Sequence, residues 1–254
     1  MIILSWRSLA LWMLGFPEAA LTDANRALKD ADELGHAATL MNAQGLTSST
    51  HVLCGNYATA NGPFDQLVTL ADEKGSLFWK AIGMMGQGWI LALTGRASDG
   101  VEKLTAALNT WRSTGATLCV PTWLSGLARA YAKLGQFDDA WRCIGEAMTT
   151  VETTNERWFE AYTHHIAGEI ALMSPEPDAA KAEAYFERAL AVARKQQAKS
   201  WELRAAMGLA RLKRDQGKRD EAHDLLAPVY GWFTEGFDTL DLKEAKTLLD
   251  ELAP

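Results

Sequence analysis

The sequence has few cysteines and no motif that would hold a metal ion. Cys54, Cys119 and Cys143 are odd in number and far apart, so buried thiols in a reducing cytoplasm are expected rather than disulfides. The five histidines form no HExxH pair, and no CxxC is present. We therefore expect neither a metal site nor a cofactor.

Apolar runs long enough to enter a membrane are also lacking. Fifteen uncharged residues lie between Lys80 and Arg96, fewer than the roughly 18–20 that a membrane span needs. The N-terminal stretch "MIILSWRSLALW" has no basic head before its apolar residues, and Arg7 interrupts them. It is therefore not a signal peptide. A cytoplasmic protein without membrane contact is expected.

Charge is missing from one stretch and unbalanced in another. Residues 35–64 contain no Lys, Arg, Asp or Glu, which indicates a unit that is buried or covered by a partner. The whole chain has a net charge of −7, but residues 188–219 hold ten basic and two acidic residues. No nucleic-acid recognition motif accompanies them, so a solvated helix face or docking onto an acidic protein surface is favoured over nucleic acid.

The glycine-rich run at residues 82–89, "IGMMGQGW", has two interpretations, a phosphate-binding loop or a helix kept small for close packing. Its order G-x-x-G-x-G is not the dinucleotide fingerprint, and no G-x-x-x-x-G-K-[ST] occurs in the sequence. Three glycines lower helix propensity, and close helix packing compensates for that loss. We predict a helix here, with Gly88 at a packing position.

What the sequence does contain is a repeat of about forty residues. Glycine recurs at Gly15, Gly55, Gly95 and Gly135, and a small residue follows each of them five positions later. This small position is Ala20, Ala60, Gly100, Ala140, Ala182 and Ala222 along the chain. Between the glycines, apolar residues recur at the i, i+3, i+4 and i+7 spacing of amphipathic helices. Stacked helix–turn–helix units are therefore predicted.

We expect residues 1–254 to form one domain of six units. The units are expected at about 1–35, 36–75, 76–115, 116–155, 156–198 and 199–236. Gly88 and Gly168 are the equivalent small residues of two first helices. A capping helix is expected at about 239–252, with Leu242, Ala245, Leu249 and Leu252 facing inward and Lys243, Glu244, Lys246 and Glu251 outward.

The stretch "LARAYAKLGQFDDAWRCIGEAM" resembles a tetratricopeptide (TPR) unit, in which small and large residues alternate at fixed positions. Segments such as "SLALWMLGFPEAAL" and "AGEIALMSPEPDAAKAEAYFERALAVAR" are similar to the C-terminal TPR region of bacterial adenylate/guanylate cyclase–ATPase–TPR regulatory proteins. Tyr162 and His165 depart from that pattern. The resemblance implies an all-α, TPR-like right-handed superhelix without catalytic residues.

In TPR arrays the first helix of each unit lines the concave surface. That geometry implies a groove formed by Asn42, Met85, Trp89, Arg129, His164, Arg204 and Arg211. Such a groove runs from neutral and aromatic to cationic, and suits an extended segment with an acidic end or an anionic small molecule. The ten tryptophans either pack between units or anchor a ligand. Glu160 and His164 lie four residues apart, as do His165 and Glu169, and both are expected to be surface pairs rather than catalytic or metal sites.

We therefore expect a non-catalytic interaction module that binds a protein or peptide in its groove and is part of, or partner to, a cyclase/ATPase-type signalling protein. The catalytic domains of that system are expected partners. The alternative is a small-molecule-sensing TPR domain of a transcription-regulator-like ATPase. The first helix, "IILSWRSLALWML", is apolar nearly all round, which predicts a homodimer through the N-terminal unit.

Overall fold

A computed structural model describes residues 1–253, which form thirteen α-helices and no strand. The helices are α1 (Ile2–Leu14), α2 (Pro17–Leu34), α3 (Ala37–Leu53), α4 (Tyr57–Glu73), α5 (Leu77–Leu93), α6 (Ala97–Ser113), α7 (Val120–Lys133), α8 (Phe137–Thr154), α9 (Glu160–Met173), α10 (Ala179–Gln196), α11 (Lys199–Asp215), α12 (Arg219–Tyr230) and α13 (Leu240–Leu252). Within this part of the chain, no helix combines the length and apolar character that crossing a bilayer requires.

Most of the helices end where the backbone turns left-handed. Gly15 has φ of 91°, and its N–H bonds the carbonyls of Leu11 and Trp12 at the end of α1. Asn155 and Gln197 take the same role after α8 and α10, with φ of 57° and 56°. Glycine and asparagine adopt this conformation readily, so most turns could be recognised from the sequence, whereas Gln197 could not.

Small residues let the two helices of each unit approach closely. The alanines among the predicted small positions, Ala20, Ala60, Ala140, Ala182 and Ala222, are fully buried. A Cβ at Gly100 would lie 2.9 Å from the backbone nitrogen of Ala92, and one at Gly168 would lie 2.6 Å from the ring of Phe186. Both glycines are therefore required by packing rather than by backbone conformation.

The glycine-rich run at residues 82–89 lies inside α5, which confirms the predicted helix. A Cβ at Gly83 would lie 2.7 Å from Val68, and one at Gly88 would lie 2.9 Å from the Leu104 side chain and 3.1 Å from its backbone nitrogen. The ring of Phe64 fills the space beside Gly86. The three glycines therefore admit α4 and α6 to the surface of α5.

Gly88→Leu is expected to lower the free energy of unfolding by roughly 1–3 kcal/mol, because the new side chain would overpack the contact with α6. Gly145→Leu is the matched control. Gly145 is also inside a helix, but nothing lies within 4 Å of a Cβ built there, so leucine should be tolerated. Thermal melting of the two variants measures the difference, and equal melting temperatures would contradict the packing role of Gly88.

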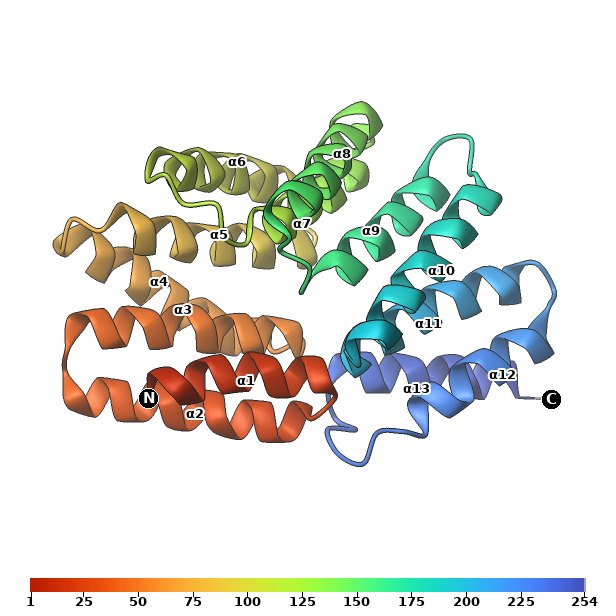
Figure 1. The fold of residues 1–254 in the computed structure, drawn as a ribbon, viewed down its shortest axis with the longest axis horizontal. Coiled ribbons are helices and arrows are strands. Elements are labelled where there is room, and N and C mark those ends of the chain that lie inside the picture. Colours follow the sequence, from red (N-terminus) through yellow and green to blue (C-terminus); the bar gives the residue numbers. More distant parts are fainter. Residues whose placement is uncertain (254) are drawn as a thin grey trace.

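The last helices return to the first unit, so the array closes on itself (Figure 1). The rings of Trp12 in α1 and Trp201 in α11 meet edge to face, with centroids 4.7 Å apart. The Ser200 hydroxyl donates to the Trp12 carbonyl over 2.5 Å. In the segment between α12 and α13, Glu235 accepts a 2.9 Å hydrogen bond from the Ala19 amide.

Closure leaves one face of α1 covered and another open. Leu9 and Trp12 are buried, at 4% and 1% exposed. Ile2, Ile3 and Trp6 are exposed by 51%, 79% and 44%. The helix that is apolar nearly all round is thus partly covered from within the chain.

Candidate functional site

Two adjoining cavities lie on the concave side, lined mainly by the first helices of the units. The ionic cavity, of about 240 Å³, contains the charged side chains of Arg129, Lys133, Glu169, Arg204, Arg211, Asp241 and Glu244. The aromatic cavity, of about 110 Å³, is lined by Trp6, Phe78, Trp79, Trp89, Trp111, Trp123, Trp158 and Phe159. Leu53 and Trp89 line both cavities, so the two spaces meet at these side chains.

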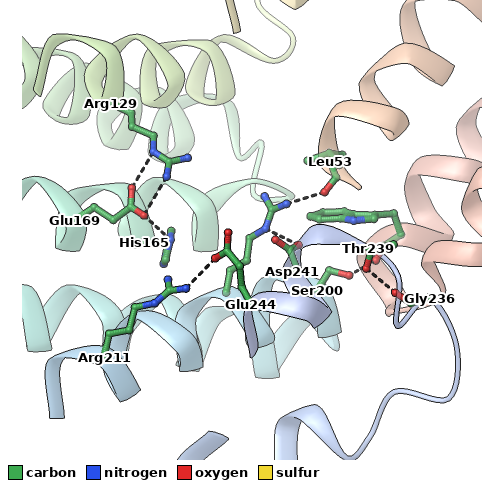
Figure 2. Close-up of polar contacts among 12 residues, drawn as sticks. Leu53, Arg129, His165, Glu169, Ser200, Arg211, Gly236, Thr239, Asp241 and Glu244 are labelled. Carbon is green, nitrogen blue, oxygen red and sulfur yellow. Dashed lines mark hydrogen bonds and ion pairs between the residues drawn. The ribbon is translucent and has the colours of Figure 1, made fainter. Parts of the chain in front are cut away.

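The ionic cavity is organised around three arginine–carboxylate pairs, which Figure 2 shows together. Arg129 and Glu169 lie 3.0 Å apart, and His165 Nε2 lies 3.3 Å from the same carboxylate. Arg211 reaches Glu244 of α13 over 2.8 Å. Most of the positive charge in the cavity is therefore balanced by the protein's own carboxylates.

Arg204 belongs both to the cavity and to the ring closure. It pairs with Asp241 over 2.8 Å and donates to the Leu53 carbonyl over 2.7 Å. Its guanidinium lies 4.9 Å and 5.1 Å from the ring centroids of Trp12 and Trp201, which is within cation–π range. Arg204 thus joins α3, α11 and α13 at one point, and its role is structural as well as electrostatic.

Burial and neighbouring charge set the protonation states in the ionic cavity. Burial alone would raise the pKa of Glu169, but the Arg129 guanidinium and the hydrogen bond with His165 outweigh it and lower this pKa to about 2. Burial and the nearby Arg129 charge lower the pKa of Lys133. Its ammonium lies 3.3 Å from the Ala92 carbonyl. Because its pKa is lowered in this way, Glu169 is ionised at neutral pH.

The aromatic cavity differs in chemistry. None of the described residues that line it carries a charge. Its aromatic rings meet edge to face, as for Trp111 with Trp123, whose centroids are 4.6 Å apart. Phe78 lies 4.6 Å from Trp111 on the other side. These rings form a rigid apolar wall, and Trp6 and Phe78 remain exposed by 44% and 37%.

Several buried polar atoms around the two cavities have no hydrogen-bond partner among residues 1–253. In the ionic cavity this atom is Nδ1 of His165, whereas the Tyr162 hydroxyl faces the indole nitrogen of Trp89. In the aromatic cavity they are Asn42 Oδ1, Thr122 Oγ1 and the indole nitrogen of Trp111. Buried polar groups normally have partners, so this concentration indicates a place where water or a ligand supplies them.

The structure divides the seven predicted groove residues into three groups. Asn42, Met85 and Trp89 line the aromatic cavity, and Arg129, Arg204 and Arg211 line the ionic one. His164 lies outside both, in a separate cavity of about 230 Å³ with Glu160 and Arg188. His165 lines the ionic cavity in its place, because one residue along a helix rotates a side chain by about 100°.

Sequence reasoning missed the carboxylates that balance the arginines. Glu169 follows His165 by one helical turn, a spacing that the sequence shows, but its partner Arg129 lies forty residues away. Glu244 was assigned to the outward face of the capping helix, and it points across to Arg211. The expectation of a cationic end is therefore corrected to a cavity of paired charges.

No cluster of three or more His, Cys, Asp or Glu residues that could hold a metal ion occurs in the described part of the chain. His164 and Glu160 form no direct pair within it. Glu160 instead pairs with Arg157 at 3.1 Å, and Arg188 lies 3.9 Å away. Burial lowers the pKa of His164, so this side chain is a neutral packing residue at neutral pH.

The helix pairs and the capping helix define an all-α, TPR-like solenoid, which confirms the fold class predicted from the sequence. No family model and no curated protein matches this chain. The apo form of RapI is similar, with a TM-score of 0.66 and 14% identity over 96% of this chain and 82% of that one.

Two further solved structures are described as sensors. The apo quorum sensor NprR from B. thuringiensis gives a TM-score of 0.54 at 14% identity, over 98% of this chain and 80% of that one. A signal-transduction ATPase with a TPR sensor, from Pyrococcus horikoshii, gives 0.54 at 13% identity, over 99% of this chain and 38% of that one. At these identities the similarity shows the fold alone.

Proposed function

We propose that this chain is a non-catalytic regulatory module that binds an extended segment of a protein or peptide in its two concave cavities. The observation that carries the proposal is the junction at Trp89. There a neutral aromatic cavity opens beside a charged one, and both contain buried polar atoms without partners in residues 1–253. A segment with an apolar residue and a nearby acidic group fits both spaces.

The pairing of the arginines favours an acidic group on the bound segment. Arg211 and Glu244 are exposed by 40% and 44% on their side chains, and an exposed pair contributes little to stability. A carboxylate of the ligand can therefore replace Glu244 as the partner of the Arg211 guanidinium at a small cost in free energy. Arg129 is bound to the less exposed Glu169, so we expect it to hold the cavity together rather than to meet the ligand first.

A display library of random linear peptides, selected on the wild-type protein, tests the proposal. Enrichment of sequences that combine an apolar and an acidic residue is expected, and Ser49→Phe should abolish their binding by filling the aromatic cavity, which Ser49 lines. Ser113→Phe adds the same ring at an exposed position at the end of α6 and should leave binding unchanged. Failure to enrich any peptide that distinguishes these two variants would contradict the proposal.

The finer assignment is that the module serves a cyclase/ATPase-type signalling system, as the sequence resemblance implies. A solved signal-transduction ATPase with a similar fold carries a TPR sensor, which supports this assignment. A small-molecule sensor is the second candidate, since the ionic cavity of about 240 Å³ is compact. Co-purification with a cyclase or ATPase chain supports the first assignment. A metabolite that raises the melting temperature when no peptide binds supports the second.

We also propose a twofold dimer through the open face of α1, because Ile2, Ile3 and Trp6 are exposed together. Trp6→Glu is expected to convert the dimer to a monomer, since a charge would be buried in an apolar contact. Light scattering coupled to size exclusion measures the mass. A wild-type protein that is monomeric at tens of micromolar would contradict the dimer.

A further inference from the structure

The aromatic cavity combines two properties that a packing defect would not have. It lacks charged residues in its described lining, and it holds unpartnered polar atoms on several helices. Thr122 is 5% exposed and Trp111 is 1% exposed, so neither polar atom is open to bulk solvent. The walls of the cavity are therefore apolar, apart from a few polar atoms that lack hydrogen-bond partners.

The hydroxyl of Thr122 is unpartnered for a local reason. A helical threonine usually donates to the carbonyl four residues back, as Ser125 does to Pro121 over 2.8 Å. For Thr122 that residue is Leu118, which precedes α7, and Cys119 between them has a left-handed φ of 64°. The start of α7 thus leaves this hydroxyl free within the described chain and beside the cavity.

The unpartnered atoms also define which hydrogen-bonding groups a ligand must carry. Trp111 has an indole N–H group, which only donates, whereas Asn42 Oδ1 only accepts. A ligand that satisfies them must offer both an uncharged acceptor and an uncharged donor. An amide, with one carbonyl and one N–H, supplies both.

The size of the cavity limits the rest of the ligand. A volume of about 110 Å³ is smaller than the roughly 150 Å³ apolar cavity that holds benzene in other proteins. It suits one branched aliphatic side chain, or one ring if the exposed Trp6 and Phe78 move slightly. A charged side chain is excluded, since none of the described lining residues could neutralise it.

We infer that the aromatic cavity is a specificity pocket for one uncharged apolar amino-acid residue, recognised through its side chain and its adjoining backbone amide. This inference deepens the proposed function and rests on it for the peptide character of the ligand. Trp89 lines both cavities, so the amide lies at the junction and the following part of the segment enters the ionic cavity.

Capped single amino acids test the pocket without any knowledge of the natural ligand. N-acetyl-leucinamide, N-acetyl-phenylalaninamide, N-acetyl-lysinamide and N-acetyl-glutamamide with a free side-chain carboxylate are titrated into ¹⁵N-labelled protein, and the indole N–H resonances are followed. The two neutral probes are expected to move the Trp89 and Trp111 resonances and to bind at least tenfold more tightly than the charged ones. Equal affinity for all four probes would overturn the inference.

Thr122→Val distinguishes a ligand-binding role of the Thr122 hydroxyl from a structural one. Removing an unpartnered hydroxyl should leave the melting temperature unchanged or slightly higher, yet weaken N-acetyl-leucinamide binding about fivefold. Thr163→Val is the matched control, because its hydroxyl is paired with Ser125 at 2.9 Å. It should lower the melting temperature without affecting the probe. Wild-type affinity in Thr122→Val would count against the pocket.

The pocket and the proposed function can fail separately. If the neutral amides bind and no library peptide does, the peptide-binding function fails and the pocket stands. If library peptides bind and lose affinity in Ser49→Phe, but no amide moves the Trp89 resonance, the single-residue pocket fails and the function stands.

Discussion

Glu169→Gln is expected to lower the free energy of unfolding by about 3 kcal/mol near pH 6 and to have almost no effect near pH 2. The pKa of Glu169 falls from 4.5 to about 2 on folding, and each pKa unit corresponds to about 1.4 kcal/mol. Because the folded pKa is the lower one, the ionised carboxylate stabilises the protein above pH 4.5. That contribution is lost as the pH falls through about 2.

Urea unfolding of the wild type and Glu169→Gln across pH 2–6 measures this contribution as the difference between the two midpoints. Glutamine keeps the size of the side chain, so the pH dependence of the difference isolates the charge. Glu146→Gln is the control, since Glu146 is exposed by 43% in a surface pair with Arg112 and should change stability little. A difference for Glu169→Gln that is independent of pH would show that its charge does not stabilise the fold.

Trp12→Ala is expected to lower the free energy of unfolding by about 3–5 kcal/mol, the usual range for removing a buried aromatic side chain. Trp12 is 1% exposed, and it contacts Trp201 and Arg204 of α11. In an open solenoid each unit contacts only its neighbours. These contacts instead join the first unit to the last, so their loss should also open the ring.

Small-angle scattering and thermal melting measure the two effects of Trp12→Ala together. The radius of gyration is expected to rise and the melting temperature to fall. Leu34→Ala, at the end of α2 and exposed by 54%, is the control and should leave both nearly unchanged. A compact Trp12→Ala protein with a wild-type melting temperature would contradict closure of the ring by this contact.

The fold class could be predicted because its signals are local. Glycine at Gly15, Gly55 and Gly95 adopts the left-handed conformation that ends helices, and the small position five residues later admits the neighbouring helix. The capping helix could be predicted from its apolar spacing, and Leu242, Ala245 and Leu252 are buried as expected. Leu249 is half-buried against the same core, and Leu248, which was not among the expected inward residues, is buried too.

Closure and charge pairing could not be predicted, because both depend on contacts distant in the sequence. The Ser200–Trp12 hydrogen bond joins residues 188 positions apart, and the Arg204–Leu53 bond joins residues 151 apart. Only the rotation accumulated over all units brings them together. The one-residue shift from His164 to His165 has a different origin, since a repeat pattern does not fix the rotation of a helix to within one residue.

The sequence left open whether the tryptophans pack between units or line a ligand cavity. The structure places tryptophans in both environments. Trp12 and Trp201 are fully buried and pack against each other between helices. Trp6, Trp89 and Trp111 line the aromatic cavity, and of these Trp6 and Trp89 keep part of their surface open. The repeat pattern alone does not distinguish them, because a cavity forms only where several first helices converge.

A single bound segment is proposed to occupy both concave cavities. Fluorescence anisotropy of the strongest library peptide tests this proposal most directly, with the wild type, Ser49→Phe in the aromatic cavity and Arg211→Gln in the ionic cavity. Binding at least tenfold weaker is expected for each variant, with melting temperatures close to that of the wild type. A peptide that binds both variants with wild-type affinity would contradict the proposal.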